Sequence, residues 1–310
     1  MTTFGDRLSH SVRRCRTPVL VGLDPRLEQL PPALQPTVAT DLTAVAAAYA
    51  EFCRGVIDTV SVSVPAVKPQ AAFFEQLGAP GMAALAEVIG YAREQGLLVI
   101  LDGKRNDIGS TAAAYADAYL GQSSAWGAHA LTVNPYLGSD SLEPFVDVAR
   151  EREAGIFVLV KTSNPGSHML QDLVSEECAI YRRVGEVVEQ LAVQTRGVGD
   201  YGSVGAVVGA TYPEQLAELR RAMLHTWLLV PGFGAQGGSA ADVSGAFDSD
   251  GLGAVINSSR AIIFAYQRAP YCERHDPRNW QRCVEEATQD MIAQLASETP
   301  AGRLLDGTRS

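Results

Sequence analysis

One stretch of sequence decides the fold: Gly96-Leu97-Leu98-Val99-Ile100-Leu101-Asp102-Gly103-Lys104-Arg105-Asn106-Asp107. Its first half is apolar and predicts a buried β-strand. Charged side chains follow at Asp102, Lys104, Arg105 and Asp107. Because residues i and i+2 of a strand point to the same face, Asp102 and Lys104 are expected side by side at the carboxyl end of that strand. Charges there are costly unless they pair or take part in chemistry, and α/β enzymes keep their active sites at this end of their strands.

Apolar segments of this kind alternate with longer amphipathic segments along the chain. The predicted strands are Pro18–Leu23, Pro65–Pro69, Leu97–Asp102, Ala130–Asn134, Gly155–Lys161, Gly205–Val208, Thr226–Pro231 and Ala254–Asn257. The predicted helices are Asp41–Val60, Gly81–Gln95, Thr111–Tyr119, Ser141–Arg152, Cys178–Gln194, Thr211–Met223 and Asp276–Ala296. Most of the strands are continuously apolar, which is typical of parallel strands covered by helices. Eight such units favour an α/β fold, the single-domain (β/α)8 TIM barrel; a doubly wound sheet is the alternative, since periodicity cannot show whether a sheet closes.

No linker rich in proline, serine and glycine divides the chain. We therefore expect one TIM-barrel domain over residues 1–298 and a polar, frayed C-terminal tail over residues 299–310. Two long connections follow strands, Asn164–Glu177 after the fifth and Gly237–Gly251 after the seventh. The second is rich in small residues and is expected to form a mobile lid over a ligand.

Composition excludes some classes of function. The chain has 310 residues and a formal net charge of −10, which leaves no basic excess for a nucleic-acid or membrane-surface partner. Five widely spaced cysteines without a CxxC motif indicate a reduced, cytoplasmic setting. We expect neither a signal peptide nor a membrane span, because no apolar run approaches ~18 residues.

Charged side chains at the strand ends form a candidate site, because a barrel brings these ends to one mouth. They are Asp24, Lys68, Asp102, Lys104 and Asp107. Carboxylates so close together resist joint ionisation unless lysines separate them: at ~4 Å and an effective dielectric of ~20, each like-charge contact costs ~4 kcal/mol. A substrate anion held against Asp102 would be repelled, and Lys104 could protonate the atom left behind once that anion departs. The array favours chemistry that removes a negative group and protonates carbon.

A phosphate site is indicated after the seventh and eighth strands. The turn Gly234-Ala235-Gln236-Gly237-Gly238 would expose backbone N–H groups, and Asn257-Ser258-Ser259-Arg260 opens the next helix. Barrels commonly bind phosphate at this place, at the N-terminus of a short helix. Arg260 would add charge-assisted hydrogen bonds.

These motifs together resemble a known family. The segment Asp102–Thr111 resembles the signature of the orotidine 5′-phosphate decarboxylases. Further matches occur in order between about residue 15 and residue 265, at Val21–Pro25, Lys68–Glu75, Thr132–Tyr136, Thr162–Gly166, Val230–Gly238 and Asn257–Ile262. The chain is most similar to the longer, bacterial-type subgroup, with its Asn-Pro-Tyr turn after the fourth strand.

The resemblance implies a TIM barrel that decarboxylates orotidine 5′-phosphate to UMP in de novo pyrimidine biosynthesis, with no cofactor and no metal. It implies that Lys104 protonates C6 and that Asp102 faces the departing carboxylate. It further implies that Lys68 bridges Asp102 and the ribose. Asp107 completes this catalytic set, and the resemblance places Asp107 and Thr111 in the neighbouring site of a homodimer.

The resemblance also implies a set of binding residues. Asp24 would contact a ribose hydroxyl, and Ser163 would read the pyrimidine. Gln236 and Arg260 would grip the phosphate, with backbone N–H groups of Gly237 and Ser259 assisting.

Three other interpretations remain open. The charges around Asp102 could be a structural ion-pair network. The chain could instead be a Mg²⁺-dependent decarboxylase or aldolase acting on a sugar phosphate, against which Lys68 and Ser163 argue. It could also be a nucleotide-binding protein without catalysis, although binding alone does not require carboxylates that repel an anionic ligand.

Overall fold

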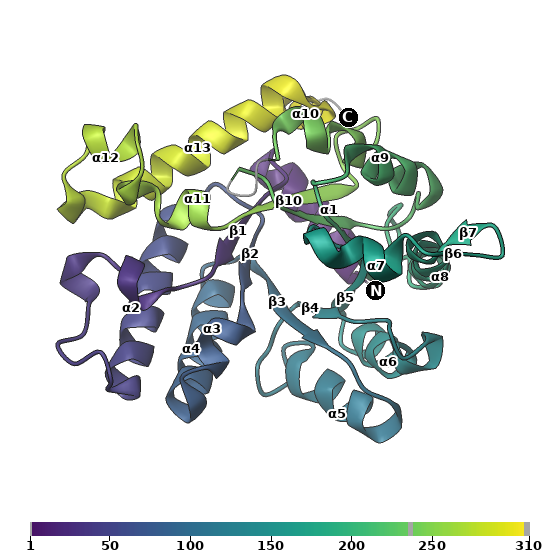
Figure 1. Cartoon of the computed structure of the whole chain (residues 1–310), viewed down its shortest axis with the longest axis horizontal. Coiled ribbons are helices and arrows are strands. Elements are labelled where there is room, and N and C mark those ends of the chain that lie inside the picture. Colours follow the sequence, from purple (N-terminus) through teal and green to yellow (C-terminus); the bar gives the residue numbers. More distant parts are fainter. Residues whose placement is uncertain (1, 235–237, 307–310) are drawn as a thin grey trace.

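The computed structural model describes residues 2–234 and 238–306. Eight parallel strands form a closed barrel surrounded by helices (Figure 1). β1 pairs with both β2 and β10, with Val19 opposite Ile256, so the ring of strands closes. The predicted single-domain TIM barrel is therefore confirmed, and the doubly wound alternative is wrong. The barrel strands are β1 (Val19–Leu23), β2 (Ala66–Pro69), β3 (Leu98–Arg105), β4 (Ala130–Val133), β5 (Gly155–Lys161), β8 (Val204–Val208), β9 (Leu228–Pro231) and β10 (Ala254–Ser258).

Each predicted helix has a counterpart in the structure, with ends displaced by a few residues. The helices of at least eight residues that follow the strands are α2 (Leu42–Val60), α4 (Gly78–Glu94), α5 (Gly109–Tyr119), α6 (Glu143–Glu151), α8 (Ile180–Gln194), α9 (Pro213–Ala222) and α13 (Trp280–Glu298). Short helices complete the mouth and the rim: α3 (Ala71–Glu75), α7 (His168–Gln171), α10 (Ala240–Val243), α11 (Arg260–Ile263) and α12 (Tyr271–Arg274). None of the helices in the described ranges has the length and apolar character needed to cross a membrane.

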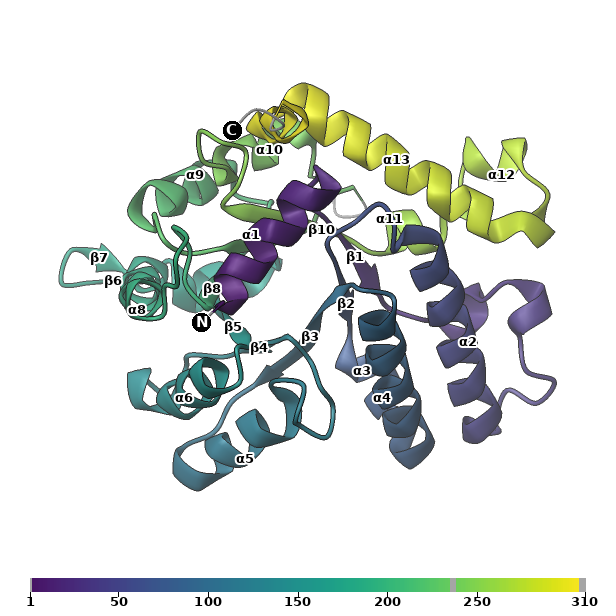
Figure 2. The same ribbon diagram turned by 180° about the vertical axis from the view of Figure 1, so that it is seen from behind.

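One long helix was not predicted. α1 (Phe4–Cys15) begins with a capping box in which the Thr3 and Asp6 side chains each accept the other's backbone N–H. Its apolar side is fully buried, and the ring of Phe4 meets that of Phe157 edge to face at 6.0 Å. α7 lies in front of the strands in Figure 1, whereas α1 lies in front of them in Figure 2, the view from behind, so the two helices lie at opposite ends of the barrel. α1 therefore seals one end of the barrel and leaves the other end open for the site.

Two connections expected to be loose contain packed secondary structure in their described residues. Most of the described part of the expected lid, residues 238–251, is packed structure, because α10 and the 3-10 turn Ser244–Ala246 bury Ala240, Val243 and Ala246. Gly237 lies outside the described residues. Within the tail, Pro300–Leu305 form a 3-10 helix that is capped by Thr299 and buries Ala301 and Leu304. Apolar side chains thus hold residues 299–306 in place, and the boundary at residue 298 stays a prediction.

Candidate active site

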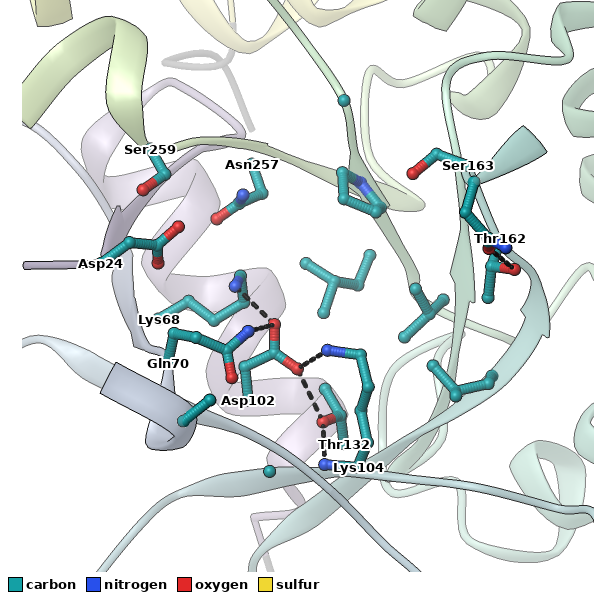
Figure 3. Close-up of a pocket in the computed structure, with 18 of the residues that line it drawn as sticks. Asp24, Lys68, Gln70, Asp102, Lys104, Thr132, Thr162, Ser163, Asn257 and Ser259 are labelled. Atoms are coloured by element: carbon teal, nitrogen blue, oxygen red, sulfur yellow. Dashed lines mark hydrogen bonds and ion pairs between the residues drawn. The ribbon is translucent and has the colours of Figure 1, made fainter. Parts of the chain in front are cut away.

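The open end of the barrel holds a cavity of about 940 Å³ at the carboxyl ends of the strands. Figure 3 shows the polar side chains that surround it. Of the residues predicted from the sequence, Asp24, Lys68, Asp102, Lys104, Ser163, Ser259 and Arg260 line this cavity. The strand-end charges and the two loop clusters therefore do meet at one mouth.

Asp102 is the centre of the site. Its Oδ2 lies 2.7 Å from Lys68 Nζ and accepts a hydrogen bond from Gln70 Nε2 at 3.0 Å. Its Oδ1 lies 2.5 Å from Lys104 Nζ and accepts a hydrogen bond from Thr132 Oγ1 at 3.0 Å. Four donors thus fix the Asp102 carboxylate, which is 8% exposed (Figure 3). They come from β2, from the residue that follows β2, from β3 and from β4.

These contacts control the charge of the site. Burial alone would raise the pKa of the Asp102 carboxyl, but the ammonium groups of Lys68 and Lys104 and their hydrogen bonds outweigh it and hold this pKa well below its usual range. Burial would likewise lower the pKa of Lys68, yet the charges of Asp102 and Asp24 raise it overall. The site therefore keeps a buried carboxylate ionised between two lysine side chains.

The backbone at Lys104 departs from a regular strand. Lys104 has a φ of +46°, a left-handed conformation that non-glycine residues seldom adopt. The pairing of β3 with β4 shifts register between Leu101 and Arg105, and the Lys104 N–H donates to Thr132 Oγ1 at 2.9 Å. The prediction that Asp102 and Lys104 lie together is confirmed, but a bulge held by Thr132 places them, and β3 continues three residues beyond its predicted end.

Asp24 and Ser259 lie on one side of the cavity, with Asn257 beside them (Figure 3). Asp24 Oδ1 and Asn257 Oδ1 are buried and have no hydrogen-bond partner in the described parts of the chain. Gly22 makes this arrangement possible, because a Cβ there would lie 2.7 Å from the Cβ of Ser259. Two unpaired acceptors beside a cavity call for a ligand that brings hydroxyl or amine donors.

The loops around the mouth supply the remaining residues. Ser163 follows β5 and faces the cavity from the side opposite Asp24 (Figure 3). Arg260 is the first residue of α11 and forms no ion pair with any residue of the described ranges. A free guanidinium at this position suits an anionic ligand. Gln236 and Gly237, both predicted to bind phosphate, lie outside the described residues.

Two predicted site residues do not line this cavity. Asp107 is half-buried, and its Oδ1 accepts the backbone N–H of Ile108 at 2.8 Å. Thr111 is exposed at the start of α5. One chain therefore brings together Lys68, Asp102 and Lys104 but not the fourth member of the predicted set.

Sequence reasoning missed several residues that shape the site. Gln70 and Thr132 bind the Asp102 carboxylate directly, and Asn257 offers an unpaired acceptor. The sequence does indicate Gln70, because it stands two positions after Lys68 at a strand end and so faces the same side. It also indicates Thr132, because its hydroxyl is isolated within an apolar strand. In the described ranges, no three histidine, cysteine or acidic side chains gather as metal ligands would.

Comparison with known proteins gives consistent similarities. Residues 17–274 match the model of the Orotidine 5′-phosphate decarboxylase / HUMPS family. The chain is 58% identical to the orotidine 5′-phosphate decarboxylase of Rhodopirellula baltica, covering 95% of this chain and 99% of that protein. It is 47% identical to the enzyme of the same name from Deinococcus radiodurans, covering 85% and 90%. The solved structure of Leishmania donovani OMP decarboxylase superposes with a TM-score of 0.73 at 35% identity, covering 95% of this chain and 98% of that one.

Proposed function

Since this chain belongs to the orotidine 5′-phosphate decarboxylase / HUMPS family and is a carboxy-lyase, we propose that it converts orotidine 5′-phosphate to UMP and CO2 in pyrimidine biosynthesis. The observation that carries the proposal is the Asp102 carboxylate, which is buried and ionised between Lys68 and Lys104 beside an open cavity. A binding site for a nucleotide anion has no need of a fixed negative charge at its centre. A site that expels a carboxylate can use such a charge, because the repulsion is relieved when CO2 leaves.

The proposed reaction starts with the substrate carboxylate held against Asp102. Their repulsion raises the energy of the bound substrate and disappears when the C6–carboxylate bond breaks and CO2 leaves. The electron pair left on C6 takes a proton from Lys104 Nζ, and the resulting neutral amine regains a proton from water. Lys104 suits this role because its side chain is 45% exposed while its Nζ remains 2.5 Å from Asp102. The proposed step needs no cofactor, since these side chains supply both the charge and the proton.

The placement of the rest of the substrate follows from the two sides of the cavity. Asp24 and Lys68 would bind ribose hydroxyls, a role supported by the unpaired Oδ1 of Asp24. Ser163 would contact the pyrimidine from the opposite side. Arg260 and Gln236, with the N–H groups of Gly237 and Ser259, would hold the phosphate. These roles rest on the family pattern together with the positions of Asp24, Ser163, Ser259 and Arg260 around one cavity.

We also propose that the active species is a homodimer in which Asp107 and Thr111 complete the neighbouring site. Both residues lie away from the cavity of their own chain. Ile108, Tyr136 and Leu137 on the adjoining loops are exposed by 57%, 73% and 46%, which gives a second copy an apolar surface to cover. A cytoplasmic location is part of the same proposal, and the five free cysteines agree with it.

The direct test is the fall in ultraviolet absorbance when purified protein is mixed with orotidine 5′-phosphate, measured with and without EDTA. Turnover that EDTA does not affect supports the proposal. Activity lost to EDTA and restored by Mg²⁺ would favour the sugar-phosphate type of chemistry. Tight binding of UMP without any turnover would favour a nucleotide-binding protein.

A further inference from the structure

Lysine is rare in this chain, and its positions are not scattered. Only Lys68, Lys104 and Lys161 occur among the 25 basic residues. All three belong to barrel strands, β2, β3 and β5, at or near the ends that open on the cavity. Lys68 and Lys104 bind Asp102, whereas Lys161 does not line the cavity and has no part in the proposed reaction. A buried lysine without a role in catalysis calls for another explanation.

The Lys161 side chain is fully buried behind the wall of the cavity. Its Nζ lies 2.6 Å from Asp172 Oδ1, 4.6 Å from the ring centre of Tyr212 and 5.6 Å from that of Tyr181. A carboxylate and two aromatic faces thus replace the water that a buried ammonium group gives up. Arginine would not serve equally well, because its planar fork of five donors needs more acceptors than this space offers.

The two partners of this ion pair stand at the two ends of one loop. Lys161 ends β5, Asp172 follows α7, and the loop between them lines the cavity through Ser163, Leu170 and Gln171, among others. A second contact lies next to the ion pair. Gln171 Oε1 accepts the backbone N–H of Thr162 at 3.0 Å, and Gln171 Nε2 donates to Thr162 Oγ1 at 2.8 Å. Residues 161 and 162 are therefore fastened to residues 172 and 171, which closes the base of the loop.

The loop base also fits tightly against the next barrel strand. The N–H of Gly209, just after β8, donates to the Lys161 carbonyl oxygen at 2.8 Å. A Cβ at Gly209 would lie 2.8 Å from Ser163 Cβ and 2.9 Å from the Ser163 backbone nitrogen. A small movement of the base therefore displaces Ser163.

We infer that the Lys161–Asp172 ion pair is a positioning device that closes the loop Thr162–Gln171 and sets where Ser163 and Gln171 meet the ligand. Lys161 acts through the loop, so it is a positioning residue and not a catalytic one. The identity of the ligand rests on the proposed function, but the closing of the loop does not.

The test uses Lys161→Met, which keeps an unbranched side chain and removes the charge, and Asp172→Asn, which keeps the shape of the partner and one hydrogen bond. Amide hydrogen exchange in residues 163–172 should speed up by at least about tenfold in Lys161→Met, with exchange in β1 and β10 unchanged. The KM for orotidine 5′-phosphate should rise about tenfold with kcat changed by less than about threefold. The double variant should have the KM of Lys161→Met alone, because that substitution already removes the ion pair and Asp172→Asn then has no pair left to remove.

Arg183→Met is the matched control. It removes an exposed cation of α8 that forms only exposed ion pairs, with Glu186 and Glu176, so exchange in residues 163–172 and KM should both stay at wild-type values. The inference is overturned if Lys161→Met only lowers the melting temperature, or if KM effects of the two single variants multiply in the double variant. If Lys161→Met fails to fold, Asp172→Asn decides alone by the exchange measurement. If the wild-type protein does not turn over orotidine 5′-phosphate, the proposed function fails. The hydrogen-exchange measurement then still tests whether the Lys161–Asp172 ion pair closes the loop.

Discussion

The two ends of the barrel both bury polar and charged groups, and they treat them in opposite ways. At the open end, the Asp102 carboxylate is held by Lys68, Lys104, Gln70 and Thr132 beside a cavity that admits a ligand. At the sealed end, under α1, His129 is 5% exposed and accepts the N–H of Val99 at 2.9 Å.

Arg220 belongs to the same sealed end. It donates to the backbone oxygens of Thr226 and Gly253 at 3.0 and 2.9 Å. The open end thus concentrates opposite charges where water and ligand can reach them, whereas at the sealed end His129 and Arg220 Nη1 bind backbone groups. The difference indicates that polar groups at the open end serve chemistry and those at the sealed end serve stability.

Lys104→Ala should give the largest effect. Loss of the proposed proton donor should lower kcat by about 10²- to 10⁴-fold while the melting temperature stays close to that of the wild type. Arg220→Ala at the sealed end should do the reverse, lowering the melting temperature and leaving kcat near its wild-type value. Steady-state kinetics and calorimetry of the two variants check the comparison, and a Lys104→Ala enzyme with near-normal kcat would end it.

Mixing two inactive variants tests whether the open end is shared between subunits. Asp107→Ala and Lys104→Ala should each be nearly inactive. After unfolding and refolding together, about a quarter of the sites should regain both residues, because half of a random mixture is heterodimer with one intact site. Activity assays on mixtures whose heterodimer content is verified by mass spectrometry give the result. No recovery would contradict the shared site.

Arg260→Ala should weaken the open end without removing its chemistry. Loss of charge-assisted hydrogen bonds to phosphate should raise the KM for orotidine 5′-phosphate by about 10²-fold and leave kcat less affected. The Kd for UMP should rise by a similar factor, whereas the Kd for uridine, which has no phosphate, should not change. Calorimetric titration with both ligands separates these outcomes, and an unchanged KM would reject the assignment.

The last effect concerns stability in acid and leaves turnover near pH 7 unchanged. Burial, assisted by the charges of Arg7 and Arg93, lowers the pKa of His129 to about 3. Below about pH 6.5 His129 binds a proton in the unfolded chain but stays neutral in the folded protein. The free energy of unfolding therefore keeps the full contribution of His129 above that pH and falls by about 1.4 kcal/mol per pH unit between pH 6.5 and 3. The pKa of Asp102 is also lowered, so its contribution is lost only below about pH 4.

Urea unfolding of His129→Gln and the wild-type protein between pH 7 and 4.5 separates these two contributions. The free energy of unfolding of the variant should depend less steeply on pH in this window, by about 1.4 kcal/mol per pH unit, because no histidine at position 129 binds a proton on unfolding. If the free energy of unfolding has the same pH dependence in the two proteins, the pKa of His129 is not lowered in the folded state.

Much of the fold could be predicted because its signals are local. Eight apolar segments with helices between them favoured a barrel, and the spacing of Asp102 and Lys104 placed both side chains in one site. α1 was missed although Thr3 and Asp6 carry a capping signal, because only Phe4, Leu8 and Val12 mark its apolar stripe. The packed segments 238–251 and 299–306 were missed because segments rich in small or polar residues are typical of loops and frayed ends.

The parts of the site that could not be predicted depend on contacts between distant segments. The conformation of Lys104 requires the Thr132 hydroxyl of the neighbouring strand. The burial of Lys161 requires Tyr181 and Tyr212, which stand 20 and 51 positions further along the chain. The proposed role of Asp107 and Thr111 in a neighbouring site depends on an assembly, and the sequence of one chain indicates it only through resemblance to a family.

The placement of the lysines has a practical consequence for handling the protein. Acylating dyes, aldehydes and amine-coupling resins react with primary amines, and the only accessible side-chain amine is that of Lys104, since Lys68 and Lys161 are buried. Where such a reagent attaches through a side chain, it would attach through the proposed proton donor and inactivate the molecule. A maleimide directed at the exposed Cys272 offers a tether that leaves the mouth of the barrel free.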